Sequence, residues 1–324
     1  MNARATLQAR VEQYLAERRQ LGFKLRSTSH ALGNFARYVA QVKHHGPLSV
    51  DLMAEWARQA KAGQGTHATY ARRLRQLRPF ARWLQRFDPT IEVPSESIFG
   101  SIPGRVAPHI YRENEIVDLL AAAKRLGPPG DLRAAVYETL FGLLASTGLR
   151  ISEALSLLDA DVDLKSGVLT IRQSKFGKSR LVPMHPSTTQ VLARYRAQRC
   201  SHLRTMPQTP FFVGTRGRLL GGPLGDRQVH RIFEQLRGQL GWVNRGCHGA
   251  PRIHDLRHTF AVMRLMLWHQ QGIDLDQRML ALSTYLGHAR VSDTYWYLTG
   301  VPELMALAGA RFERFADPME ANDE

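Results

Sequence analysis

The feature that most limits how this chain can fold is a segment rich in proline and glycine that separates two stretches with helical periodicity. Residues 88–108 read DPTIEVPSESIFGSIPGRVAP and show no apolar repeat of helical spacing. Proline and glycine interrupt regular elements, so a segment of this kind is typical of the connection between two domains. A chain of 324 residues is also longer than one hydrophobic core usually serves. The sequence therefore predicts a first domain over residues 1–95, a linker over residues 96–109 and a second domain beyond it.

The first domain is predicted to be helical, with short polar turns between its helices. Apolar residues recur at helical spacing over residues 7–22, 27–42, 49–60 and 66–87. Pro79 is expected to kink or restart the last of these helices, because proline has no backbone donor. The same helix carries a stripe of arginines that is either a solvated face or a surface for phosphate contact: Arg75, Arg78, Arg82 and Arg86.

The net charge narrows the class of partner. The chain has 44 Lys and Arg residues against 28 Asp and Glu, a formal net charge of +16. Such an excess repels itself in the folded state unless a polyanion offsets it, and nucleic acid is the usual polyanion. A polybasic membrane contact is the alternative. The excess is mostly arginine spread along the chain, however, not lysine clustered beside a hydrophobic anchor, so we expect nucleic acid and no membrane.

The compartment can be predicted from the cysteines and the apolar runs. Cys200 and Cys247 do not make a disulfide framework, and this usage suits a reducing cytosol. No apolar run approaches the length that spans a membrane, and the charged N-terminal residues do not resemble a signal peptide. We therefore expect a cytoplasmic protein.

The second domain is predicted to be mostly helical with one small antiparallel sheet. Helical patterns cover residues 112–127 and 131–147, and Gly148 is typical of a left-handed residue that ends a helix. Residues 167–173 and 179–184 read as strands around the hairpin turn SKFGK. Further helices are predicted over residues 149–158, 188–198, 226–238, 254–270, 276–285 and 303–315.

Several residues of this second domain suit the chemistry of a phosphodiester. Attack on phosphorus gathers negative charge on the equatorial oxygens, and guanidinium groups match these oxygens bidentately without losing protons. Arg150 opens a helix, and Arg257 lies three residues after His254 on one helix face. A tyrosine nucleophile needs neighbouring cations and a proton acceptor, because ionising a phenol with a pKa of about 10 at pH 7 costs roughly 4 kcal/mol.

Each candidate also has a structural interpretation that the residues alone leave open. Arg150 can form an ordinary ion pair with Glu153 one turn later. His254 and His288 can serve as helix caps or as satisfied core histidines, and the aromatic run YWY near the C-terminal end can be core filling.

A metal site is a further alternative. His254 and His258 lie one helical turn apart, and Cys247 is a candidate third ligand. Arg257 shares that crowded face and opposes a bound cation, and a fourth ligand is not evident. We therefore expect no metal at this site.

Four motifs occur in order over about 150 residues: STGLRISEAL, SKFGKSRLVP, HDLRHTFA and LGHARVSDTYWYL. Together they resemble the motif set of the tyrosine recombinases, the phage-integrase family. The helical first domain and the linker are similar to the core-binding domain of that family, so the resemblance covers essentially the whole chain.

The resemblance implies a role for each matching residue. The scissile phosphate is expected to be bound by Arg150 and Arg257, and Lys175 in the hairpin is expected to act as the general acid. The other implied residues are two histidines that assist proton transfer and phosphate binding and one structural partner for the first arginine: His254, His288 and Glu153.

The nucleophile is implied by its distance from the LGH motif. The family places it nine positions after this histidine, which selects Tyr297 over Tyr295. On one helix these two side chains differ by about 200° around the axis, so they cannot both face the phosphate, and Tyr295 or Trp296 is expected to pack inward. Many relatives have a histidine two positions after the nucleophile, where this chain has Thr299. The sequence therefore does not assign this chain to a particular subgroup of the family.

The implied fold is mainly α, with two domains that form a C-shaped clamp on DNA. Residues 1–95 correspond to the helical core-binding domain, and residues 110–302 to a mostly α catalytic domain with a small antiparallel sheet. The implied enzyme is a site-specific recombinase that cleaves and rejoins double-stranded DNA through a 3′-phosphotyrosyl intermediate and a Holliday junction. It would serve the integration, excision or transposition of a mobile element, and we expect a stand-alone transposon or plasmid type. No cofactor is implied, because the phosphotyrosyl link conserves the bond energy.

The implied partners are specific recombination sites on DNA and further copies of the chain. The family acts as a homo-tetramer on paired sites, in bacteria at the nucleoid, and other recombinase chains of the same element are further candidate partners. Residues 303–324 resemble the C-terminal helix and tail that docks on a neighbouring protomer. Packing on its own domain is the alternative for the apolar residues of this segment, which are Leu304, Leu307 and Phe312.

Three other functions stay open on the sequence. A type IB topoisomerase uses the same transesterification to relax DNA as a monomer, and a non-catalytic DNA-binding accessory protein would have the same fold. A zinc-dependent hydrolase is the third, and activity that survives chelation would exclude it.

Overall fold

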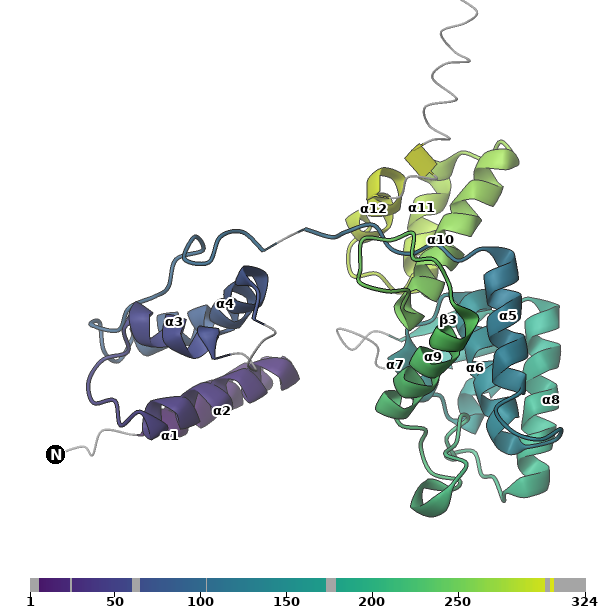
Figure 1. The fold of residues 1–324 in the computed structure, drawn as a ribbon, viewed down its shortest axis with the longest axis horizontal. Helices are drawn as coiled ribbons and strands as arrows, with labels where there is room; N and C mark the ends of the chain where they lie inside the picture. The colour runs from purple at the N-terminus through teal and green to yellow at the C-terminus, as the bar shows by residue number, and fades with distance from the viewer. Residues whose placement is uncertain are drawn as a thin grey trace, which may run out of the picture. The chain divides into compact units, whose positions relative to one another are not determined.

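The computed structural model describes residues 6–23, 25–59, 65–102, 104–172, 179–300 and 304–305 (Figure 1). The chain divides into two compact units, residues 1–104 and residues 105–324, each with a hydrophobic core of its own. Both units are mainly helical, and the second contains a three-stranded antiparallel sheet. The predicted fold class, mainly α with a small antiparallel sheet, is confirmed.

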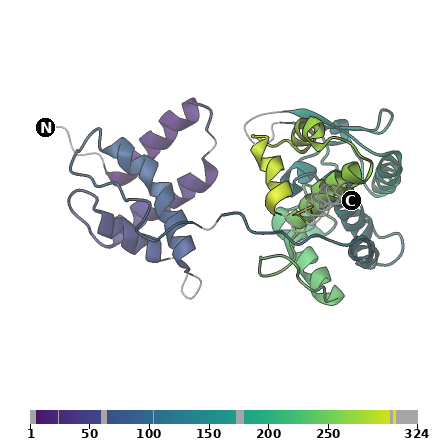
Figure 2. The ribbon, with the colours of Figure 1, turned by 90° about the horizontal axis from the view of Figure 1, so that it is seen from above.

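In its described residues, the first unit has four helices around one core (Figures 1 and 2). They are α1 (Leu7–Gln20), α2 (Arg26–Gln41), α3 (Val50–Arg58) and α4 (His67–Leu84). Three of them begin at a hydroxyl side chain that accepts a hydrogen bond from the first helical turn, which satisfies one of the free backbone donors there. These N-caps are Thr6, Ser49 and Thr66. The core contains mainly large aromatic and aliphatic side chains, among them Tyr14, Leu32, Phe35, Trp56, Leu77, Phe80 and Trp83.

The proline-rich segment after α4 takes part in the packing of this unit. Ile91 and Phe99 are buried in its core, and Ile102 packs against it. The rings of Phe99 and Tyr70 have centroids 5.5 Å apart. The boundary between the two units follows at Gly104.

Helix α4 differs from its predicted form at two positions. It runs without interruption past Pro79, so the helix does not restart there. Arg78 is buried, and it donates to the carbonyls of Pro94 and Ser95 and pairs with Glu96 at 2.9 Å. The prediction of Arg78 as part of an exposed stripe is therefore wrong.

The reason lies in the helical period. Arg78 is one turn beyond the buried Leu74 and so faces inward, where it holds the following segment against the helix. Arg75, Arg82 and Arg86 are exposed.

The second unit begins with two long helices, α5 (Glu113–Lys124) and α6 (Leu132–Thr147), followed by the short α7 (Ile151–Leu155). The 3-10 helix η1 (Asp159–Asp161) leads into the sheet. The remaining helices are α8 (Pro186–His202), the 3-10 helix η3 (Gly217–Leu219), α9 (Asp226–Leu240), α10 (Ile253–Gln270), α11 (Leu275–Leu286) and α12 (Ser292–Gly300).

The sheet has strand order β1–β2–β3 and is antiparallel throughout. Strands β2 (Val168–Ile171) and β3 (Arg180–Pro183) form the predicted hairpin, with Leu169 opposite Val182. Strand β1 (Val162–Asp163) was not predicted, because two residues are too short to show an alternating pattern. The hairpin tip, residues 173–178, lies outside the described residues, and so does most of the predicted helix 303–315.

Two clusters of buried side chains stabilise the second unit. The larger one joins α5, α6, α8 and α9 to the sheet, and α6 is its centre because Val136, Leu140 and Phe141 are fully enclosed. The smaller one lies among α10, α11 and α12, which Figure 1 shows side by side, and includes Val262, Leu282 and Tyr297. Within the described ranges, none of the helices combines the length and the apolar character that crossing a bilayer requires.

The junction between α6 and α7 depends on a glycine. Gly148 ends α6 with a left-handed backbone (φ 61°) and donates its N–H to the carbonyl of Leu144. A Cβ atom at this position would lie 2.6 Å from Cδ1 of Phe260 on α10. The tight turn lets the N-cap of α7, Arg150, follow only two residues later.

We expect Gly148→Ala to lower the free energy of unfolding by about 1–3 kcal/mol, since alanine is strained in a left-handed backbone and its methyl group would also meet Phe260. Gly238→Ala in α9 is the matched control, because that glycine is helical with open space around its Cα. There the same change should raise stability by up to about 1 kcal/mol. Urea denaturation of both variants tests this, and equal shifts would contradict the role given to Gly148.

Candidate active site

Two arginines from separate helices converge on the C-terminal turn of α11. Arg257, in the first turns of α10, donates from Nη1 to the carbonyl of Gly148 at 2.8 Å and from Nη2 to that of Leu286 at 2.7 Å. Arg150 donates from Nη2 to the carbonyl of Gly287 at 2.9 Å. Carbonyls at a helix C-terminus have no intrahelical donor and carry partial negative charge, so they can hold two guanidinium groups close together. The structure thus brings together the two residues predicted to bind a phosphate.

The two guanidinium groups differ in exposure. Arg257 is 2% exposed, whereas the side chain of Arg150 keeps 22% of its surface. Burial, followed by the charge of Arg150, lowers the pKa of Arg257 to about 10, so this side chain is still protonated at pH 7. Arg150 is therefore the more open of two permanent cations.

Glu153 lies between Arg150 and a third arginine, Arg180 on β3. Its Oε1 accepts from Nη1 of Arg150 at 2.8 Å, and its Oε2 accepts from Nη2 of Arg180 at 2.9 Å. Oε2 also accepts from the backbone N–H of Arg150 and so caps α7. Burial alone would raise the pKa of Glu153, but the hydrogen bonds and charge of Arg180 and then those of Arg150 lower it to about 2.

Tyr297 lies inside the second unit in this structure. Its side chain is 2% exposed, and its hydroxyl shares a hydrogen bond of 2.9 Å with Nδ1 of His258. Tyr295 points elsewhere: it is 39% exposed, and its hydroxyl donates to Oδ1 of Asp276 at 3.0 Å. Tyr295 therefore does not pack inward, while Trp296 is half-buried beside Tyr297.

The charge of the neighbouring arginines reaches Tyr297. Burial raises the pKa of its phenol to about 12, whereas the positive charges of Arg257, Arg105 and Arg150 oppose this rise. Arg105 stands at the start of the second unit, where it pairs with Asp293 in the first turn of α12. The phenol is accordingly neutral at pH 7 and lies in a positive field.

Three histidines surround this tyrosine and these arginines. The ring of His288 stacks on that of Tyr297, with centroids 6.4 Å apart, and its Nδ1 contacts Oγ1 of Thr294 at 2.7 Å. His254 is exposed at the edge of this group of side chains. The centroids of the His254 and His258 rings are 4.8 Å apart.

All three histidines are neutral at pH 7. Burial and then the neighbouring positive charges lower the pKa of His288 to about 3 and of His258 to about 2. For His254, whose ring edge stays exposed, the partial loss of solvent around the rest of the ring and then the charges of Arg257 and Arg252 lower the pKa to about 4. Each ring therefore has one nitrogen free of a proton, which is the form that can accept one.

Sequence reasoning missed the contact of His258 and the presence of Arg180. His258 was considered only as a metal ligand, although its position one turn after His254 and beside Arg257 places it on the site's edge. Lys175 lies outside the described residues, and Thr299 belongs to the last turn of α12. Across the part of the chain that the structure describes, no group of three or more His, Cys, Asp or Glu side chains is placed to hold a metal ion.

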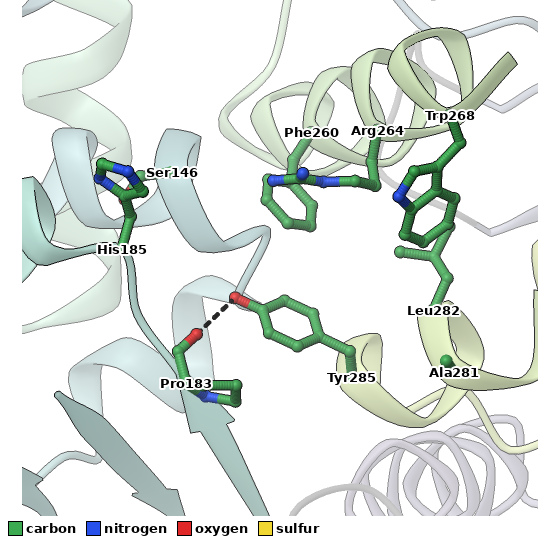
Figure 3. Close-up of a pocket in the computed structure, with 9 residues that line it drawn as sticks. All are labelled: Ser146, Pro183, His185, Phe260, Arg264, Trp268, Ala281, Leu282 and Tyr285. Carbon is green, nitrogen blue, oxygen red and sulfur yellow. Dashed lines mark hydrogen bonds between the residues drawn. The ribbon is translucent and has the colours of Figure 1, made fainter. Parts of the chain in front are cut away.

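A separate apolar pocket of about 260 Å³ lies between β3, α10 and α11. Figure 3 shows the hydroxyl of Tyr285 pointing at the carbonyl of Pro183, to which it donates at 3.3 Å. This contact ties β3 to α11. The arginine cluster and Tyr297 are not part of the pocket, whose lining residues include Ser146, His185, Phe260, Arg264, Trp268 and Leu282.

We expect Glu153→Gln to lower the free energy of unfolding by roughly 3 kcal/mol at pH 7, because it leaves two largely buried arginines without a counter-charge. The folded pKa of about 2 lies below the ordinary 4.5, so this stabilisation is present above pH 4.5 and is lost as the pH falls towards 2. Urea denaturation at several pH values between 7 and 3 should show the two proteins converging. The exposed Glu234→Gln on α9 is the control and should change stability by less than about 0.5 kcal/mol at every pH.

Comparisons with known proteins agree with this geometry. Residues 110–301 match the model of the phage integrase family. The chain is 40% identical to the putative integrase/recombinase y4rB of Sinorhizobium fredii over 313 residues, which covers 96% of this chain and 98% of that one. It is 31% identical over 238 residues to tyrosine recombinase XerC of Thermodesulfovibrio yellowstonii, covering 71% and 70% of the two chains.

Solved structures show the same fold. The integrase of transposon Tn1549, in complex with transposon right end DNA, matches with a TM-score of 0.64 and 19% identity over 95% of this chain and 99% of that one. A lambda integrase dimer bound to a core site matches with a TM-score of 0.59 and 18% identity over 90% and 77%. The family match, the sequence relatives and the cluster of arginines beside a buried tyrosine lead to one conclusion: the chain belongs to the phage integrase family and is a tyrosine recombinase, an enzyme of DNA strand transfer.

Proposed function

We propose that this recombinase cleaves and rejoins double-stranded DNA at specific sites through a 3′-phosphotyrosyl intermediate on Tyr297. The observation that carries the proposal is the convergence of Arg150 and Arg257 on adjacent carbonyls, close enough for both charges to act on the Tyr297 phenol. Two fixed guanidinium groups beside a phenol are suited to a phosphodiester whose charge grows during attack.

The proposed step exchanges one phosphate ester for another. A bond forms between the phenolic oxygen of Tyr297 and phosphorus, and the bond from phosphorus to the 5′ oxygen breaks. Arg150 and Arg257 offset the charge on the non-bridging oxygens, and Lys175 protonates the leaving oxygen. The phenol gives its proton to one of the site histidines, His254, His258 or His288, whose pKa values the negative charge of a bound phosphate would raise. A 5′-hydroxyl from a partner strand then reverses the step, so no nucleotide cofactor is required.

The buried position of Tyr297 places one condition on this chemistry. Its hydroxyl is hydrogen-bonded to His258 and has almost no exposed surface, so it reaches a phosphate only after α12 has shifted. Such a shift exchanges the contact with His258 for one with the phosphate held by the arginines. We propose that DNA binding drives this exchange.

We propose that the first unit holds DNA through the exposed arginines of α4. Arg75 and Arg82 are two turns apart and differ by only about 20° around the helix, and Arg86 follows just past its end. A row of this kind can follow a phosphate backbone without reading its sequence. Arg78 is left out, since its guanidinium is bonded to the protein.

We further propose that the enzyme acts on a mobile element as a homo-tetramer on paired sites, through a Holliday junction, and in the bacterial cytoplasm with the nucleoid. The similarity in fold to the Tn1549 transposon integrase supports this role. Residues 110–302 would be the catalytic domain, residues 1–95 the core-binding domain and residues 96–109 the linker. Residues 303–324 would dock on a neighbouring protomer, and other recombinase chains of the same element are candidate partners.

Incubation with a nicked duplex that carries one end of the element tests the nucleophile. Wild-type protein should form an adduct that survives denaturation, and Tyr297→Phe should form none, because a phenyl ring has no oxygen to attack phosphorus. Tyr295→Phe is the matched control and should keep the adduct. An adduct that is lost only in Tyr295→Phe would refute the assignment, and relaxation of supercoiled DNA without such a site would favour a topoisomerase.

The two phosphate arginines should matter for rate more than for affinity. Arg150→Ala and Arg257→Ala should each slow adduct formation by about a hundredfold or more, the scale for one lost transition-state donor. Duplex affinity should change little, because many other phosphate contacts contribute to it. Single-turnover cleavage and fluorescence anisotropy measure the two quantities, and a large loss of binding with an unchanged cleavage rate would mean that these arginines only anchor the DNA.

A further inference from the structure

We infer that Arg180 is a positioning residue for strand transfer, which holds Arg150 in place through Glu153 and through the C-terminal turn of α11. The inference rests on the proposed function, because Arg150 is the group proposed to bind the scissile phosphate. Arg180 belongs to β3, and its guanidinium contacts Glu153 and a backbone carbonyl.

The first observation is the geometry of the Arg180 side chain, which is only 10% exposed. Its Nη1 and Nη2 donate to the two carboxylate oxygens of Glu153 at 3.0 and 2.9 Å, a bidentate pair. Its Nε donates to the carbonyl of Tyr285 at 2.8 Å. The planar fork is thus directed at protein groups on two other helices, and it does not face a ligand.

The second observation is that Glu153 is shared. The same carboxylate accepts from Nη1 and from the backbone N–H of Arg150, so two guanidinium groups compete for one negative charge. The three side chains together carry a net charge of +1. Without Arg180 the carboxylate would neutralise Arg150 completely, and the field that Arg150 exerts on a phosphate would weaken.

The third observation is the turn that follows α11. The carbonyls of three successive residues accept from three arginines: Tyr285 from Arg180, Leu286 from Arg257 and more weakly from Arg150, and Gly287 from Arg150. Gly287 has a left-handed backbone, and a Cβ atom there would lie 2.6 Å from Nη1 of Arg180. The turn therefore lies directly against the Arg180 guanidinium. The position of this guanidinium thus affects where the carbonyls of Leu286 and Gly287 lie.

The core of the sheet is made by apolar side chains, not by Arg180. The buried apolar side chains of the sheet are Val162, Leu169, Ile171 and Val182, and β3 is also tied to α11 by the contact between Tyr285 and Pro183 (Figure 3). Removing the guanidinium should therefore leave the sheet in place and release Glu153. A variant without this guanidinium can therefore stay folded, and a change in its cleavage rate would then report on the position of Arg150.

The test compares Arg180→Met, Arg180→Lys, Arg150→Ala and the double variant Arg150→Ala/Arg180→Met in single-turnover cleavage of the nicked duplex. Arg180→Met should slow adduct formation about tenfold or more, which is less than the loss expected for Arg150→Ala. Its affinity for the duplex should stay nearly unchanged. Arg180→Lys keeps the charge without the fork and should recover part of the rate. The double variant should be no slower than Arg150→Ala, because both changes remove the same contribution.

A second substrate separates positioning from a purely structural role. In a duplex with a methylphosphonate at the scissile position, a neutral methyl group replaces one charged oxygen, so a guanidinium that offsets this charge matters less. The ratio of wild-type to Arg180→Met rates should therefore fall towards one on this substrate. Arg199→Met is the matched control: Arg199 is also buried and donates to a carboxylate and to carbonyls, but it is bonded to Asp159 and Phe211. This control should lose stability and keep its cleavage rate.

Three results would overturn the inference: a folded Arg180→Met protein that cleaves at the wild-type rate, losses that multiply in the double variant, or an equal loss on both substrates. Should Arg180→Met not fold, the comparison of Arg180→Lys with wild type on the two substrates decides the question by the same criterion. A wild-type protein that forms no adduct overturns the proposed function, and the inference with it. In that case the failure is seen before any variant is measured.

Discussion

The site depends on one short stretch of backbone, the C-terminal turn of α11. Three consecutive carbonyls there have no partner within the helix, and each accepts a hydrogen bond from a different arginine. A helix end supplies such acceptors with only a partial negative charge, so the cluster keeps its positive character while its members are held in place. One carboxylate, that of Glu153, adds a full charge and links two of these arginines. The result is a cluster of positive charge that is held in place by the protein's own groups.

The same turn connects the arginines to the proposed nucleophile. His288 follows Gly287 directly, and its ring stacks on Tyr297 in the next helix, so the cations and the phenol are joined through a few residues of chain. The tyrosine nevertheless has its hydroxyl on His258 and very little exposed surface. The structure therefore contains an assembled set of cations beside a phenol that is buried and hydrogen-bonded to a histidine.

Sequence reasoning predicted what depends on local pattern. Helical periodicity, the hairpin and the spacing of the motifs were sufficient for the fold class and for the two arginines that the structure brings together. Contacts between distant segments were not visible: Arg180 and Glu153 are 27 residues apart, and strand alternation says nothing about which helix a strand residue will meet. Arg78 was misjudged because a stripe of arginines suggested one exposed face, although the position lies one turn from a buried leucine. Lys175 stays a prediction.

The use of peptide carbonyls as acceptors has a consequence for how the site can be damaged. A carbonyl belongs to the main chain, so no side-chain replacement deletes it, and it does not titrate at any pH at which the protein is folded. Sensitivity to mutation is therefore concentrated on the donors and on the single glycine whose missing side chain lets the turn lie against Arg180. A change in an α11 side chain therefore reaches these acceptors only through the packing of the helix, whereas a substitution at Gly287, which follows α11, acts on the turn directly.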